Sequence, residues 1–135
     1  MKKLLLLTIF LLSAFRVSAP DQKSLFIRYS HPVEPFNKLI HAVGMVEAKG
    51  DTLAYNRIEE AVGFFQIRPI RVKDYNRKTG SRYTLKDMYD YKISKKVFLY
   101  YASRIGPYDF EKIAKNWNGS GVKTIQYWKN VKKHL

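Results

Sequence analysis

The sequence predicts one small domain that is mostly α-helical. Three observations lead to this prediction. The chain has 135 residues, a length that suits a single domain. Apolar residues recur at spacings of three and four along most of residues 36–135, as they do on the buried face of a helix. Glycine or proline lies at the ends of most of these apolar stretches, and the sequence has no internal repeat.

The first helix is expected over residues 36–49. Its apolar positions fall at helical spacing, and Gly50 is a natural stop because glycine tolerates the left-handed conformation of a helix cap. Residues 51–60 are polar and turn-like. The apolar stretch 61–67 is consistent with a strand, a loop or a short helix, and its pattern does not choose among the three.

Further helices are expected downstream. One extends over residues 69–78, because proline suits the first position of a helix. Thr84 and Asp87 resemble a capping arrangement and predict a short turn. A strong helical pattern covers residues 92–105, and Pro107 is expected to open the next helix.

After a break at residues 118–121, a final helix with a basic outer face completes the expected fold. Three apolar residues mark the face that this helix is expected to bury. They are Ile125, Trp128 and Val131.

Residues 1–19 have the features of a secretory signal peptide. Two lysines precede an apolar run over residues 4–12, and small residues lead up to Ala19. The alternative is a membrane anchor, but the apolar run is shorter than the roughly 20 residues that a span requires, and Arg16 follows it. We therefore expect cleavage after Ala19, export to the periplasm or the medium, no stable membrane anchor, and an extended lead-in over residues 20–35.

The formal net charge of +14 predicts attraction to a polyanion, such as nucleic acid, an anionic membrane or an acidic cell wall. Lysine and arginine are spread along the chain and are not gathered on one recognition helix, which disfavours nucleic acid, as does the export signal. The chain has no cysteine, so disulfides, thiol catalysis and cysteine-ligated metals are excluded.

Glu47 occupies an unusual position for a carboxylate. It follows Val43 by four residues and Ile40 by seven, so it falls on the apolar face of the first helix. It also lies in the last turn, where the helix dipole disfavours negative charge. Both effects raise the pKa of a carboxyl group, as a general acid near neutral pH requires. The alternative is a glutamate at the edge of the apolar face that reaches solvent or pairs with a cation such as Lys49.

Three segments, taken in order, resemble the soluble lytic transglycosylase family. The segments are residues 46–51, residues 61–69 and residues 117–119. In that family a Glu-Ser pair closes a helix, a Gly-Leu-Met-Gln-Ile segment follows, and a Tyr-Asn-Ala-Gly segment comes later. The resemblance covers residues 36–128. It implies a lysozyme-like, goose-type helical domain over residues 36–135 with a groove for substrate.

The resemblance also implies a role for individual residues. Glu47 would be the catalytic acid, and Gln66 would hydrogen-bond the sugar. The other implied substrate-binding residues are Asn118, Trp117, Phe64, Phe65 and Tyr55. Other interpretations stay open from the residue types alone, because Gln66 can be satisfied by backbone groups, Trp117 can belong to the core, and Asn118 can end a helix. The chain departs from the family at Ala48, where the family has Ser, and at Trp117, where it has Tyr.

The implied substrate is the glycan strand of peptidoglycan, cut between N-acetylmuramic acid and N-acetylglucosamine by a monomer without a cofactor or metal. In the lytic route Glu47 acts as acid and then as base, and the product is a 1,6-anhydromuramoyl end. A muramidase-type hydrolase is the alternative, and it favours a second carboxylate. Asp51, Glu59 and Glu60 are the nearby candidates, with Asp51 expected in a turn and both glutamates in solvent. A second alternative is a non-catalytic, basic wall-binding module.

Overall fold

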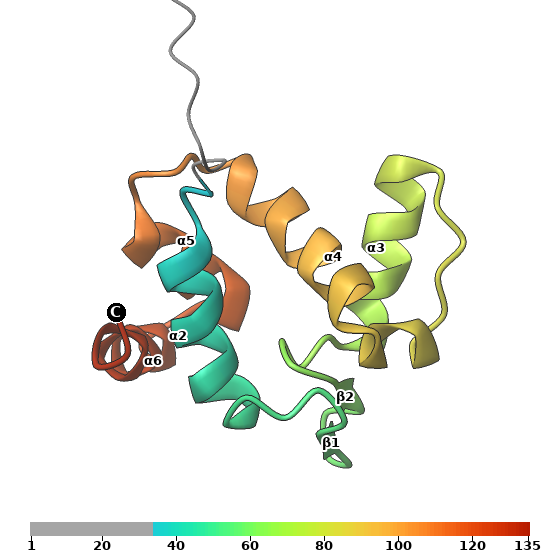
Figure 1. Ribbon diagram of the computed structural model, residues 1–135, viewed down its shortest axis with the longest axis horizontal. Helices are drawn as coiled ribbons and strands as arrows, with labels where there is room; N and C mark the ends of the chain where they lie inside the picture. Colours follow the sequence, from blue (N-terminus) through green and yellow to red (C-terminus); the bar gives the residue numbers. More distant parts are fainter. Residues whose placement is uncertain (1–33) are drawn as a thin grey trace, which may run out of the picture. The chain divides into compact units, whose positions relative to one another are not determined.

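The computed structural model describes residues 34–135, and this part of the chain is mostly helical (Figure 1). It comprises five α-helices, one short 3-10 helix and a two-stranded antiparallel hairpin. The prediction of a mostly α-helical chain is therefore confirmed. The predicted signal peptide over residues 1–19, and all but the last two residues of the expected lead-in, lie outside the described residues.

Helix α2 spans Asn37–Ala48, as the apolar spacing predicted. It buries Leu39, Ile40 and Val43 completely or almost completely. The helix ends where Lys49 adopts a left-handed conformation, with a φ of 52°. The N–H of Gly50, with a φ of 83°, then donates to the carbonyl of Gly44. This cap satisfies carbonyl groups of the last turn, the turn that also carries Glu47.

A small hairpin follows α2. Strand β1 (Tyr55–Asn56) pairs antiparallel with strand β2 (Ala61–Val62), so part of the segment predicted as turn-like is a strand. The turn is held by Asn56, whose Oδ1 accepts from the N–H groups of residues 58 and 59 at 3.0 and 3.3 Å. Val62 also exchanges backbone hydrogen bonds with Ile67. The stretch 61–67, left open by its sequence pattern, is therefore a strand followed by a tight turn.

The central helices agree with their predicted positions to within two residues. Helix α3 spans Pro69–Thr79 and ends at Gly80 with a φ of 72°. Thr84 donates to Asp87 from both its backbone N–H and its hydroxyl, at 2.6 and 2.8 Å, and this capped turn leads into the 3-10 helix η1 (Lys86–Tyr89). Helix α4 spans Tyr91–Ser103 and is capped by Asp90, whose carboxylate accepts from two N–H groups of the first turn.

The last two helices differ from their predictions in detail. Helix α5 spans Phe110–Asn118 and does not begin at Pro107, because Asp109 caps it by accepting the N–H of Lys112 at 2.9 Å. Helix α6 spans Lys123–Lys132. Its buried residues are Thr124, Tyr127 and Val131, whereas Ile125 is 49% exposed. The predicted buried face was therefore correct at Val131 and wrong at Ile125.

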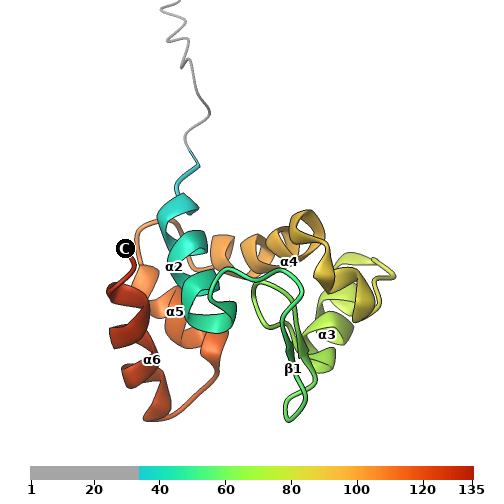
Figure 2. The ribbon, with the colours of Figure 1, turned by 60° about the horizontal axis from the view of Figure 1, so that its bottom comes forward.

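An aromatic cluster in the core joins the tight turn after β2 to α4 and α5. The rings of Phe65 and Phe98 are stacked with their centroids 4.7 Å apart. Trp117 meets Phe98 edge-on at 5.0 Å and Phe65 at 6.3 Å. Helix α6 packs against both α2 and α5 (Figure 2). Because of this packing, the end of α2, the turn after β2 and the end of α5 meet in one place.

Within residues 34–135, none of the helices has both the length and the apolar character needed to cross a membrane.

Candidate active site

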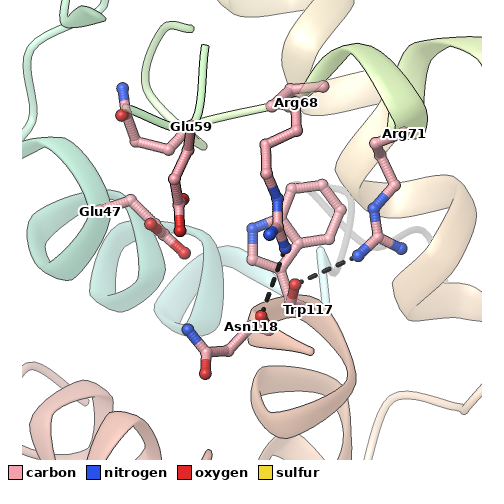
Figure 3. A pocket seen from close by; sticks show the side chains of 8 residues that line it. Glu47, Glu59, Arg68, Arg71, Trp117 and Asn118 are labelled. Carbon is pink, nitrogen blue, oxygen red and sulfur yellow. Dashed lines mark hydrogen bonds between the residues drawn. The ribbon is translucent and has the colours of Figure 1, made fainter. Parts of the chain in front are cut away.

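A narrow, polar pocket lies where the end of α2, the segment between the hairpin and α3, and the end of α5 come together (Figure 3). Segments far apart in the sequence supply its walls. The structure thus brings together four of the residues implied by the family resemblance, and adds further charged groups to them. The lining residues are Glu47, Glu59, Gln66, Ile67, Arg68, Arg71, Trp117 and Asn118.

Glu47 is partly buried in the wall of this pocket. Burial, which penalises the ionised form, raises the pKa of its carboxyl group from 4.5 to about 7. The hydrogen bond from Tyr127 lowers the pKa in part, the negative charge of Glu59 raises it, and the positive charge of Arg68 lowers it. The raised pKa predicted from the position of Glu47 on the helix is therefore confirmed, with burial as its main cause.

Tyr127 is the partner of Glu47 that the sequence pattern did not reveal. Its hydroxyl donates to Oε1 of Glu47 at 2.7 Å. Burial and the nearby carboxylate raise the pKa of this phenol above its usual value, so Tyr127 stays protonated and keeps its donor hydrogen. The sequence did contain a signal for the burial of Tyr127, because Thr124, Tyr127 and Val131 fall at helical spacing. The prediction instead placed Ile125, Trp128 and Val131 on the buried face.

Replacing Tyr127 with Phe is expected to raise the pKa of Glu47 further, by about one pH unit, because the lost hydrogen bond favours the ionised carboxylate. Carbon-13 NMR titration of glutamate carboxyl groups measures this directly. The matched control is Tyr100→Phe, which removes a buried hydroxyl that has no hydrogen-bond partner within residues 34–135. Identical titration of Glu47 in both variants would contradict the expected result.

Gln66 forms the junction between the pocket and a second, more open hollow. Its Nε2 donates to the carbonyl groups of Gly63 at 3.0 Å and Ala54 at 3.3 Å, so backbone groups satisfy the amide nitrogen. The amide oxygen accepts no hydrogen bond from residues 34–135, which leaves it free to accept one from a ligand. The backbone of Gln66 is left-handed, with a φ of 48°, in the tight turn after β2.

The open hollow extends the pocket along the hairpin. The two hollows share Glu47 and Gln66, so both border the side chain that carries the carboxyl group, and together they are called the trough. Tyr55, which is 55% exposed, lies on the rim of the open part. The residues that line the open hollow are Glu47, Ala48, Lys49, Ala54, Tyr55, Asn56, Arg57, Ile58 and Gln66.

The structure corrects the implied substrate-binding role of Phe64 and Phe65. Phe65 is fully buried among the core rings. Phe64 packs over Gly44 of α2, where a Cβ would lie 1.9 Å from its ring. Neither phenylalanine lines the pocket. Trp117 is 6% exposed, and its Nε1 donates to the carbonyl of Phe65 at 3.2 Å, so its ring belongs to the core while its edge borders the pocket.

Asn118 ends α5 on the side of the pocket opposite Glu47 (Figure 3). Its carbonyl accepts from Nη2 of Arg68 at 3.4 Å, and the carbonyl of Trp117 accepts from Nη2 of Arg71 at 3.2 Å. Neither arginine stood out in the sequence. The sequence signal that could have indicated a shared site is their spacing of three residues across the start of α3. This spacing puts both arginines on one face of the chain.

Of the three carboxylates considered as a second catalytic group, only Glu59 lines the pocket. Its side chain is exposed, as expected, and its carboxyl group lies on the same side of the pocket as that of Glu47 in Figure 3. Asp51 is held in the turn after α2, where its Oδ1 accepts the N–H of Leu53 at 2.8 Å. Glu60 is exposed and does not border either hollow.

In the part of the chain that the structure describes, no three histidine or carboxylate side chains gather as a metal site. Comparisons of the chain with protein-family models, with curated proteins and with solved structures give no significant match. The chemistry of the pocket is therefore the main basis for a functional proposal.

Proposed function

We propose that this chain is a peptidoglycan lytic transglycosylase with a lysozyme-like helical domain, and that Glu47 is its catalytic acid. One observation carries the proposal: a carboxyl group with a pKa of about 7 lies in a pocket that also contains Gln66 and Asn118. About half of such groups hold a proton at neutral pH, so the side chain can act as an acid and then as a base. The ordered resemblance of residues 46–51, 61–69 and 117–119 supports the same function.

The proposed reaction begins with proton transfer from Glu47 to the glycosidic oxygen between N-acetylmuramic acid and N-acetylglucosamine. The C1–O bond then breaks through an oxocarbenium-like state. The ionised Glu47, stabilised by the hydrogen bond from Tyr127, next takes the proton of the muramoyl C6 hydroxyl. The C6 oxygen bonds to C1 and forms the 1,6-anhydro ring. Glu47 ends protonated, and water is not consumed.

The trough supports a polymeric substrate. The enclosed pocket and the open hollow meet at Glu47 and Gln66, so sugar units can bind on both sides of the bond to be cut. Tyr55 offers an exposed aromatic face on the rim, a surface that suits the apolar face of a sugar ring. The proposal includes export through residues 1–19 and action as a monomer without a cofactor.

A hydrolase of the muramidase type is the second candidate, and Glu59 is the observation that favours it. This carboxylate lines the same pocket as Glu47 and is near enough to raise its pKa. A second carboxylate in that position can activate water for attack on C1. The lyase is preferred because it needs only Glu47, whereas Glu59 is exposed to solvent.

Digestion of purified sacculi in heavy-oxygen water separates the two reactions. The lyase gives 1,6-anhydromuramoyl ends that lack the label, and a hydrolase gives labelled reducing ends.

Replacing Glu59 with Gln is expected to leave the rate of cleavage within about tenfold of the unmodified protein. It is also expected to lower the pKa of Glu47, because a neighbouring negative charge is removed. The matched control is Glu60→Gln. A loss of about a hundredfold or more for Glu59→Gln alone, with labelled ends, would favour the hydrolase.

A further inference from the structure

Two guanidinium groups form one side of the pocket. Arg68 immediately precedes α3, and Arg71 lies in its first turn. Figure 3 shows both side chains reaching from the start of α3 toward the end of α5, with the carboxyl groups of Glu47 and Glu59 on the other side. The pocket therefore has an acidic half, of which the proposed reaction uses Glu47, and a basic half, to which that reaction assigns no role.

Neither arginine is neutralised by a carboxylate. Asp74, one turn along α3, is the acid that lies near Arg71. Its carboxylate already interacts with Arg77 and Lys78 at 2.7 Å each, and accepts the hydroxyl of Tyr101 at 2.8 Å. Within residues 34–135, no carboxylate oxygen lies within 4.0 Å of a nitrogen of Arg68 or Arg71. Two positive charges that form no ion pair with the carboxyl groups of Glu47 and Glu59 in the same pocket favour an anionic ligand on their side of it.

The guanidinium groups are also held in place. Arg71 lies over the rings of Tyr101 and Trp117, at 4.6 and 4.7 Å from their centroids, and donates to the carbonyl of Trp117. Arg68 donates to the carbonyl of Asn118. A guanidinium carries five N–H donors, so each arginine keeps most of its donors for a ligand. The first turn of α3 has no acidic residue, so its N-terminal dipole adds to the positive potential.

From this geometry we infer that Arg68 and Arg71 form a subsite for a carboxylate group of the glycan substrate. The inference rests on the proposed function, since it takes the polymer cut at Glu47 as the ligand. A planar carboxylate matches the paired N–H donors of a guanidinium. In peptidoglycan this chemistry comes from the lactyl group of peptide-free strands or from the stem peptides. The subsite selects anionic glycan over neutral glycan and orients it beside Glu47.

Calorimetric binding in a Glu47→Gln background, which prevents cleavage, tests this inference. The probes are oligosaccharides of equal length: a neutral chitooligosaccharide, a peptide-free glycan with lactyl carboxylates, and a glycan with stem peptides. Arg68→Gln is expected to weaken binding of a carboxylated probe about tenfold or more and to leave the neutral probe nearly unchanged. The probe whose affinity depends on Arg68 identifies the source of the carboxylate.

Matched variants separate a direct contact with the carboxylate from a general effect of net charge. Arg82→Gln removes the same charge from a position outside the pocket, and is expected to change each affinity less than twofold. Arg68→Lys keeps the charge but loses the paired donors, so an intermediate loss of affinity for the carboxylated probe is expected. This variant replaces Arg68→Gln in the test if Arg68→Gln does not fold.

Equal weakening of the binding of neutral and carboxylated probes by Arg68→Gln would overturn the subsite. Cleavage of sacculi by the unmodified protein is measured in parallel, so that the proposed function is judged separately.

Discussion

Replacing Glu47 with Gln is expected to reduce cleavage of sacculi by about a thousandfold or more, because the amide cannot donate the proton that the glycosidic oxygen requires. In the unmodified protein the rate should fall as the pH rises through about 7, where the carboxyl group loses its proton. The measurement is release of soluble muropeptides between about pH 5 and pH 9. Wall binding should persist in the variant, since the other groups of the trough are unchanged.

The same substitution is expected to stabilise the fold at alkaline pH. The carboxyl group of Glu47 titrates near 4.5 in the unfolded chain and near 7 in the folded protein, so the folded state binds more protons between these values. The free energy of unfolding of the unmodified protein therefore falls as the pH rises across this interval. At about 1.4 kcal/mol per pH unit, Glu47→Gln gains up to about 3 kcal/mol above pH 7 and almost nothing at about pH 4.

These two results together separate an enzyme from a wall-binding module. An enzyme loses cleavage while gaining stability, which excludes misfolding as the cause of the loss. A basic module that only binds the wall would show the stability gain and equal clearing of a wall suspension before and after the substitution. Unchanged clearing at neutral pH would therefore remove Glu47 from the catalytic role.

Gly63→Ala is expected to destabilise the domain by about 3 kcal/mol or more. Gly63 has a φ of 76°, which is unfavourable for alanine. A Cβ at this position would also lie 2.3 Å from the backbone carbonyl oxygen of Met88, which cannot move without displacing η1. Gly63 further supplies the carbonyl that accepts Nε2 of Gln66, so the pocket is disturbed along with the fold. Denaturant unfolding followed by circular dichroism measures the loss.

Gly80→Ala is the matched control for this collision. Gly80 has a similar φ of 72°, but no atom lies within 4 Å of the position where its Cβ would be. This variant carries the backbone strain alone, and a cost of about 1 kcal/mol is expected. Equal destabilisation by the two substitutions would mean that the contact between Gly63 and Met88 does not exist in solution.

Local patterns in the sequence predicted the helices well because helix formation depends on spacing and on end residues. Gly50, Pro69 and Gly80 each lie at a helix boundary, as their backbone preferences predicted. The errors also have local causes. Asp109 caps α5 more effectively than Pro107 opens it, and a two-residue pair of strands is too short to leave a periodic pattern.

The helical content and the position of Glu47 on the apolar face of its helix were predicted from the chain alone, because both follow from residues close together in sequence. The rest of the candidate site came from packing. Tyr127 reaches a carboxylate eighty positions away only because α6 packs on α2. Phe65, implied as a substrate-binding residue, is buried in the core. Arg68 and Arg71 form a basic side of the pocket because α5 ends beside the start of α3. No local pattern encodes which helix ends will meet, and burial and charge at the site depend on that meeting.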